Sequence, residues 1–194
     1  IATLATGSIL RGAGLKVSGA ASMNVSALGE LSNGRIGPIP NVLICFILAV
    51  VVFDYVLRYT AYGRHLMAIG DSARNAKRAG IKVDRNIIFA YMICGSLGAF
   101  GGILSAGQIG SVSSGFGEGN EFIVISAAVL GGTSLFGGKG NIFPGAVVGI
   151  LLITTIMNGL AMMNASPFLY TIVRGLIIFF AVALDSINHK GELR

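Results

Sequence analysis

Long apolar runs decide what this chain can fold into. Val42 to Phe53 is apolar without a break, and the segment from Pro38 to Leu57 has about the 20 residues that a helix needs to cross a bilayer. Similar stretches cover residues 86–107, 142–160 and 168–187. With 54% hydrophobic and 11% charged residues, the 194-residue chain has too little charge to cover the surface of a water-soluble domain. The sequence therefore predicts an integral membrane protein.

Two further apolar segments are shorter than a full span. Residues 1–14 could be the end of a truncated span or half of a broken helix, and residues 122–136 run into a glycine-rich stretch. The second segment favours a discontinuous or re-entrant helix, with a short tilted helix followed by a glycine turn as the alternative. We expect an all-α, polytopic fold with about four to six transmembrane or re-entrant segments. Residues 1–194 would form one transmembrane domain, a C-terminal fragment without its N-terminal helices, because the chain opens at Ile1 with a helix under way.

A basic, polar segment at residues 63–85 separates the first two long apolar stretches. Seven of the fourteen Lys and Arg residues lie between Arg58 and Arg85. The positive-inside rule predicts such clustering for a cytoplasmic loop, which accounts for the net charge of +6 without nucleic acid. Counting crossings from this loop places residues 108–121 outside and the C-terminus inside.

The inner part of this basic segment is predicted to form a short helix. Asp71 can cap its first turn, and Gly80 can adopt the left-handed conformation that ends a helix. The small residues Ala73, Ala76 and Ala79 recur every three positions. Because a helix of about two turns is marginal by itself, we expect this face to dock onto a partner at the membrane surface.

Other spacings predict contacts within the membrane. Asp54 and Arg58 are four residues apart and can pair on one helix face, as an interfacial anchor rather than a transport site. Small residues every four positions let helix backbones approach closely. This pattern occurs at Gly98, Gly102 and Ala106, and again at Gly145 and Gly149.

Enzyme motifs are not matched. The run from Thr133 to Gly140 lacks the first Gly and the final Ser or Thr of a phosphate loop. Glu118 and Glu121 have no nucleophile or His near them in sequence, and neither His has ligand-spaced companions. We expect no catalytic residue, no metal site and no cofactor in this chain.

Two strings resemble a known family. Gly63-x4-Ala68-Ile69-Gly70, with Asn75-Ala76 and Ala79-Gly80-Ile81, resembles the cytoplasmic coupling loop of the permease subunits of sugar ABC importers of the ribose, xylose and galactose type. The run from Glu121 to Gly140, which contains Gly131-Gly132-Thr133-Ser134, is similar to the C-terminal signature of that family. Asp71 stands where the family usually has Asn, a change that preserves the capping group.

The resemblance implies a multi-pass permease of a bacterial cytoplasmic (inner) membrane that translocates a monosaccharide. Its partners would be a separate ABC ATPase that holds ATP and Mg, an extracytoplasmic sugar-binding protein, a second permease copy (homodimer or close paralogue) and membrane lipid, but not nucleic acid. The ATPase-coupling residues would be Gly70, Asp71, Ala73, Asn75, Ala76, Ala79, Gly80 and Ile81. The translocation region would include Glu121, Ser126, Gly131, Gly132, Thr133, Ser134 and Asn158.

Three other functions remain open at this point. A branched-chain amino-acid or other small-solute ABC permease differs in substrate rather than mechanism. A proton- or sodium-coupled secondary transporter is disfavoured, because such proteins usually carry acidic residues deep in their spans. A passive channel or a non-transporting scaffold is the third, and uptake without ATP would favour it or the secondary transporter.

Overall fold

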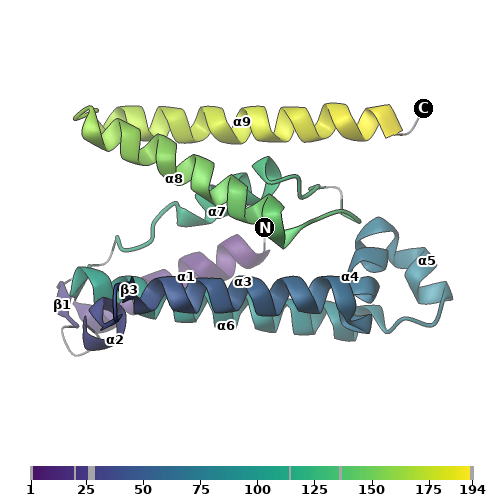
Figure 1. The fold of residues 1–194 in the computed structure, drawn as a ribbon, viewed down its shortest axis with the longest axis horizontal. Coiled ribbons are helices and arrows are strands. Elements are labelled where there is room, and N and C mark those ends of the chain that lie inside the picture. Colours follow the sequence, from purple (N-terminus) through teal and green to yellow (C-terminus); the bar gives the residue numbers. More distant parts are fainter. Residues whose placement is uncertain (1, 20, 26–28, 114, 136, 193–194) are drawn as a thin grey trace. The chain divides into compact units, whose positions relative to one another are not determined.

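The computed structural model describes residues 2–19, 21–25, 29–113, 115–135 and 137–192. Helices dominate this part of the chain, as the ribbon in Figure 1 shows, and the only strands among the described residues are two-residue pairs. Backbone contacts divide the chain into two compact units, Ile1–Leu48 with Tyr91–Glu118, and Ala49–Ala90 with Gly119–Arg194. Each unit is described by itself below.

The first unit combines helices with two small antiparallel ladders. Its elements are α1 (Ala2–Ser18), β1 (Met23–Asn24), α2 (Gly29–Asn33), β2 (Arg35–Ile36), β3 (Ile39–Pro40), β4 (Ser111–Val112), and parts of α3 (Asn41–Tyr59) and α6 (Val83–Ile109). Met23 pairs with Val112 across β1 and β4, while β2 and β3 form a hairpin in which Ile36 faces Ile39. Gly37 has a φ of 66° in the hairpin turn, a conformation that glycine adopts without strain.

The second unit holds the basic segment and the C-terminal helices. Its elements are the ends of α3 and α6 that lie in Ala49–Ala90, α4 (Ala61–Asp71), α5 (Ala73–Arg78), α7 (Asn120–Leu130), the π-helical turn η2 (Ile142–Ala146), α8 (Val147–Met162) and α9 (Pro167–Glu192). Helix α7 packs against α8, α9 and η2. The buried side chains of Ile153 on α8 and Ala181 on α9 contribute to this core.

Three helical stretches are long and apolar enough to cross a membrane: α3, α6, and Ile142–Met162, which joins η2 to α8. Two shorter apolar helical stretches accompany them, α7 and Phe168–Ala183 within α9. The predicted all-α, polytopic fold is confirmed. α7 has 11 residues, so at about 1.5 Å per residue it is too short to span a bilayer, as expected for a short helix that ends in glycine.

The predicted glycine contacts are present at Gly145 and Gly149. A Cβ atom added at Gly149 of α8 would lie 3.0 Å from the backbone nitrogen of Gly131 and would collide with the carbonyl of Ala127 on α7. Gly145 likewise lies against the backbone of Gly131. Beyond the neighbouring backbone of α6 itself, no described atom lies within 4 Å of a Cβ added at Gly98 or Gly102. Close packing at the α6 glycines therefore stays a prediction.

Candidate functional site

The basic segment forms two helices joined by a single residue, Ser72, and we call α4 and α5 the two-helix segment. Ser72 has an extended backbone; its N–H donates to the carbonyl of Ala68 at 3.1 Å, and its Oγ accepts the N–H of Asn75 at 3.4 Å. Ser72 therefore ends α4 and caps α5. The predicted cap at Asp71 is wrong by one position, because Asp71 is still the last helical residue of α4.

The predicted stop at Gly80 is confirmed. Gly80 has a φ of 81°, and the N–H of Ile81 donates to the carbonyl of Ala76 at 3.1 Å. The N–H of Gly80 donates to the carbonyl of Lys77, also at 3.1 Å, which completes a Schellman cap. Lys77 and Arg78 lie in the last turn of α5, where positive charge favours the helix dipole.

The three alanines at residues 73, 76 and 79 do not share one exposed face. Ala76 is buried, with 4% of its surface accessible, whereas Ala73 and Ala79 are exposed. Helix α4 packs against α5 and contributes the buried residue Ile69. A methyl group that packs inside the two-helix segment cannot also lie on its outer surface. Among the predicted coupling residues, Gly70, Asp71, Ala73, Asn75, Ala79 and Gly80 are exposed and Ile81 is partly exposed.

A basic groove lies between α5 and the start of α6. It has a volume of about 650 Å³ and is lined by Ala73, Arg74, Lys77 and residues 81–85. The opposite end of the two-helix segment is tied to α6, since the Tyr62 hydroxyl donates to the carbonyl of Asn86 at 3.4 Å. Burial raises the pKa of the Tyr62 phenol, so the hydroxyl keeps its proton and remains a donor at physiological pH.

Residues 131–141, which we call the glycine loop, connect α7 to η2. Gly132 has a φ of 87°, and the N–H of Thr133 donates to the carbonyl of Ala128 at 3.0 Å, so α7 ends in the same kind of cap as α5. The N–H of Ser134 donates to the carbonyl of Lys139 at 3.0 Å and closes the loop on itself. The described residues of the loop thus have a defined backbone conformation.

The glycine loop lies in backbone contact with the end of α4. A Cβ atom added at Gly70 would lie 2.6 Å from the backbone nitrogen of Gly138, a distance that real Cβ atoms do not reach. Gly137 and Gly138 have φ values of 95° and 74°, which favour glycine. Only residues without side chains allow the two backbones to come this close. These glycines therefore permit the contact between α4 and the glycine loop.

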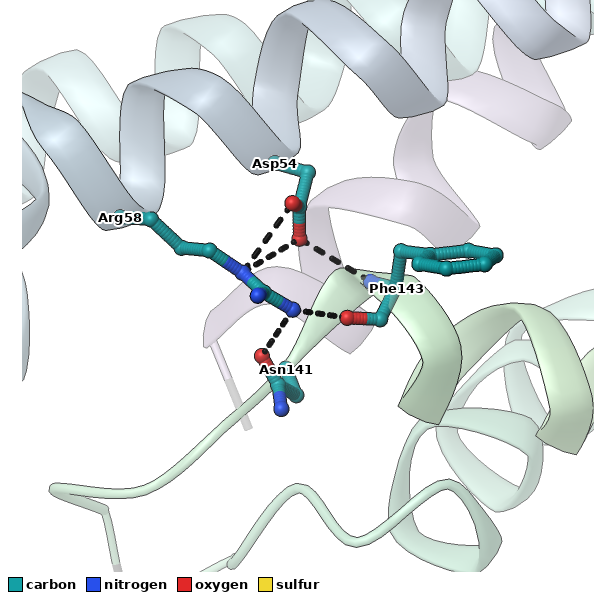
Figure 2. Close-up of polar contacts among 4 residues, drawn as sticks. All are labelled: Asp54, Arg58, Asn141 and Phe143. Carbon is teal, nitrogen blue, oxygen red and sulfur yellow. Dashed lines mark hydrogen bonds and ion pairs between the residues drawn. The ribbon is translucent and has the colours of Figure 1, made fainter.

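The end of α3 also reaches this region, as Figure 2 shows. The Asp54 carboxylate accepts the Arg58 Nε at 3.1 Å, which confirms the predicted pair, and it also accepts the backbone N–H of Phe143 at 3.1 Å. The Arg58 guanidinium donates to the Asn141 amide oxygen at 3.1 Å and to the carbonyl of Phe143. Each member of the pair therefore bonds to the segment just before α8.

A third helix, α9, holds the other end of the loop. The Asp185 carboxylate accepts the backbone N–H of Leu135 at 2.8 Å and the hydroxyl of Ser134 at 3.5 Å. Asp185 is the only acidic residue between Glu121 and Glu192. This isolation in an apolar stretch was a signal that sequence reasoning missed, whereas nothing local distinguishes Asn141 or Phe143.

The predicted translocation residues are only partly brought together. Gly131, Gly132, Thr133 and Ser134 lie in the glycine loop, and Glu121 is exposed in the first turn of α7. Ser126 is buried and donates to the carbonyl of Phe122 at 2.7 Å within α7, while Asn158 is exposed on α8. A lining role for each of these residues stays a prediction.

These elements define an α-helical, multi-pass membrane protein in which a basic two-helix segment contacts a glycine loop between two later helices. A family profile described as "Branched-chain amino acid transport system / permease component" matches residues 5–182. The chain belongs to this family of permease components, which are transporter subunits rather than enzymes, and its place is the cytoplasmic membrane. No solved structure matches the chain significantly.

Curated relatives are similar over most of the chain. The "Probable ABC transporter permease protein YphD" of Escherichia coli K12 is 39% identical over 184 residues, covering 94% of this chain and 55% of the relative. The galactose/methyl galactoside import permease protein MglC of Salmonella typhimurium is 40% identical, covering 76% and 44%. The ribose import permease protein RbsC of Bacillus subtilis is 37% identical, covering 95% and 58%. The chain spans about half the length of these relatives.

Proposed function

We propose that this chain is part of the transmembrane permease subunit of an ABC importer that carries a monosaccharide across the cytoplasmic membrane. The observation that carries the proposal is the similarity, at 37–40% identity, to import permeases named for galactose and ribose. Similar permeases named for L-arabinose and xylose, at 37% and 36% identity, extend the same substrate class. A branched-chain amino acid is the less favoured substrate, since it appears only in the family description.

In this proposal the energy comes from a separate ABC ATPase that binds ATP and Mg, and this chain contributes no catalytic residue. An extracytoplasmic binding protein delivers the sugar, and a second permease copy, identical or closely related, completes the pathway. The two-helix segment, residues 70–81 above all, receives the ATPase. Its exposed residues Ala73, Asn75 and Ala79 are available to a partner, while buried Ala76 keeps α5 packed on α4.

The geometry supports a coupling role because the two-helix segment ends on the glycine loop. A displacement of α4 toward the glycine loop has to displace Gly138 as well, since their backbones are in contact at Gly70. The glycine loop continues into η2 and α8 and begins at the end of α7. Motion imposed by an ATPase at the two-helix segment therefore has a direct route to the residues proposed to line the pathway.

The test is purification and reconstitution of the full-length protein from its native membranes. We expect an ATPase and a binding protein to copurify with it, and the reconstituted complex to accumulate labelled galactose, ribose, arabinose or xylose only with hydrolysable ATP. A non-hydrolysable ATP analogue is the matched control. ATP-dependent uptake of leucine instead would establish the amino-acid alternative. Uptake of sugar without ATP would overturn the proposal in favour of a secondary transporter or channel.

A further inference from the structure

Three helices from different parts of the chain meet at the glycine loop and the two residues that follow it. Helix α4 touches Gly137 and Gly138, α9 bonds to Ser134 and Leu135 through Asp185, and α3 bonds to Asn141 and Phe143. The described residues between 134 and 143 thus have contacts with all three helices.

We propose that Asp185 and the Asp54–Arg58 pair are positioning residues that hold residues 134–135 and 137–143 as one body, so that movement of the two-helix segment is transmitted to α7 and α8. This inference rests on the proposed function, because it assigns those residues a role in coupling. The Asp54–Arg58 pair and its partners Asn141 and Phe143 lie outside both motifs of the family resemblance. Asp185 also lies outside them, while its partners Ser134 and Leu135 lie within the second motif.

The first argument is mechanical. The contact between Gly70 and Gly138 is a van der Waals contact between backbones, which resists compression but has little resistance to separation. It can transmit a push from α4 but not a pull. A movement that reverses in each transport cycle needs attractive contacts as well, and hydrogen bonds to charged groups are the strongest ones present at this loop.

The second argument is the placement of these bonds. Asp185 accepts the backbone N–H of Leu135 at 2.8 Å, near the start of the held segment. The Asp54 carboxylate accepts the backbone N–H of Phe143 at 3.1 Å, at its end. Backbone groups at both ends are therefore fixed to helices, and the bond from Ser134 to Lys139 closes the part between them. A segment tied at both ends and closed in the middle moves as a unit.

The third argument concerns the Asp54–Arg58 pair, which Figure 2 shows in full. An i,i+4 pair that served only to stabilise α3 would need no further partners. Here Asp54 accepts a second hydrogen bond, from the N–H of Phe143, and Arg58 donates to Asn141 and to the carbonyl of Phe143. Asp54 accepts from the N–H of Phe143 and Arg58 donates to its carbonyl, so the order of the acidic and the basic residue along α3 matters.

This order gives a test that separates the proposed role from simple stabilisation. The double variant Asp54→Arg with Arg58→Asp keeps an ion pair on α3, but it places a donor opposite the N–H of Phe143. If the pair only stabilises α3, the exchange restores activity lost in the single variants. We expect no restoration, with sugar uptake per ATP hydrolysed about tenfold below wild type, as expected when bonds to charged groups are lost.

Asp185 allows a matched comparison at one position. Asp185→Asn keeps an oxygen that can accept the N–H of Leu135, whereas Asp185→Ala removes it. We expect uptake per ATP hydrolysed to remain within about twofold of wild type for Asn and to fall about tenfold for Ala. Ser186→Ala, at the next residue, is the control, because the Ser186 hydroxyl has no hydrogen bond with the described part of the chain.

A second measurement does not depend on transport. Amide hydrogen exchange of the full-length protein in detergent should become faster at residues 134, 135 and 137–139 in Asp185→Ala and stay at the wild-type rate in Ser186→Ala. Unchanged exchange in Asp185→Ala would overturn the inference, as would wild-type uptake per ATP or full rescue by the exchanged pair. Faster exchange in Asp185→Ala, combined with no ATP-dependent transport by the wild-type protein, would instead contradict the proposed function. It would still support the role of Asp185 in holding the glycine loop.

Discussion

Gly149 is the position where a single added methyl group should reveal the α7–α8 interface most directly. A Cβ atom at this position would lie 3.0 Å from the nitrogen of Gly131 and 2.9 Å from the carbonyl carbon of Ala127. Carbon atoms in contact normally lie about 3.5–4.0 Å apart, so α7 and α8 would have to separate. The obstructing atoms belong to backbone and cannot rotate away. Gly149→Ala should therefore be strongly destabilising.

The magnitude follows from two opposing terms. Overpacking against a rigid neighbour costs about 1–3 kcal/mol, and the upper end of this range, about 3 kcal/mol, applies here because the obstructing atoms belong to the backbone. Replacing Gly by Ala within a helix returns about 1 kcal/mol. The net loss is about 2 kcal/mol for Gly149→Ala. A Cβ added at Gly102 on α6 meets no described atom outside its own helix within 4 Å, so without a close-packed partner Gly102→Ala should gain about 1 kcal/mol, and the two variants should differ by about 3 kcal/mol.

The assay is reversible unfolding of the full-length protein in mixed micelles of detergent and sodium dodecyl sulfate, monitored by helical circular dichroism. The two variants introduce the same methyl group into the same type of helix, so intrinsic propensity cancels in their comparison. Equal free energies of unfolding for Gly149→Ala and Gly102→Ala would refute the argument that the α7–α8 contact requires glycine.

Two further predictions concern the two-helix segment. Ala76→Glu should bury an unpaired carboxylate, separate α5 from α4 and lower protein yield, whereas Ala73→Glu, at an exposed position, should leave the fold intact and weaken ATPase binding. Quantitative pull-down of the ATPase, normalised to folded protein, tests both variants. Equal behaviour of the two would argue against the assignment of Ala76 to the buried face and Ala73 to the exposed face. Ser72→Ala removes the cap of α5 and should cost about 1 kcal/mol locally, seen as faster amide exchange at residues 73–78; an exchange rate equal to wild type would show that the cap contributes nothing.

Local features of the sequence were reliable where one helix decides the outcome. The apolar runs predicted α3, α6 and the helix from Ile142 to Met162, and Gly80 predicted the end of α5. The Asp54–Arg58 pair followed from its spacing alone. Capping was less certain, because Asp71 and Ser72 are both good capping residues and adjacent, and only the extended backbone of Ser72 selects between them.

Contacts between distant segments could not be read from these patterns. Ala73 and Ala76 each follow a polar residue and precede a basic one, yet in the packed two-helix segment Ala76 is buried and Ala73 is exposed. Arg58 reaches Asn141, which is 83 residues away, and Leu135 reaches Asp185, which is 50 residues away. Neither spacing has a periodicity that a helix or strand would impose.

The sequence by itself determined that the chain is a membrane protein, which segments are helical and where a basic loop interrupts them, because hydrophobicity and backbone preference act within about one helix length. Tertiary structure alone decided that the two-helix segment, α3 and α9 meet at the glycine loop. The physical reason is that side chains such as Asp54 and Asp185 can satisfy their charge in many ways, and only the packed arrangement of the helices brings a particular backbone N–H within reach.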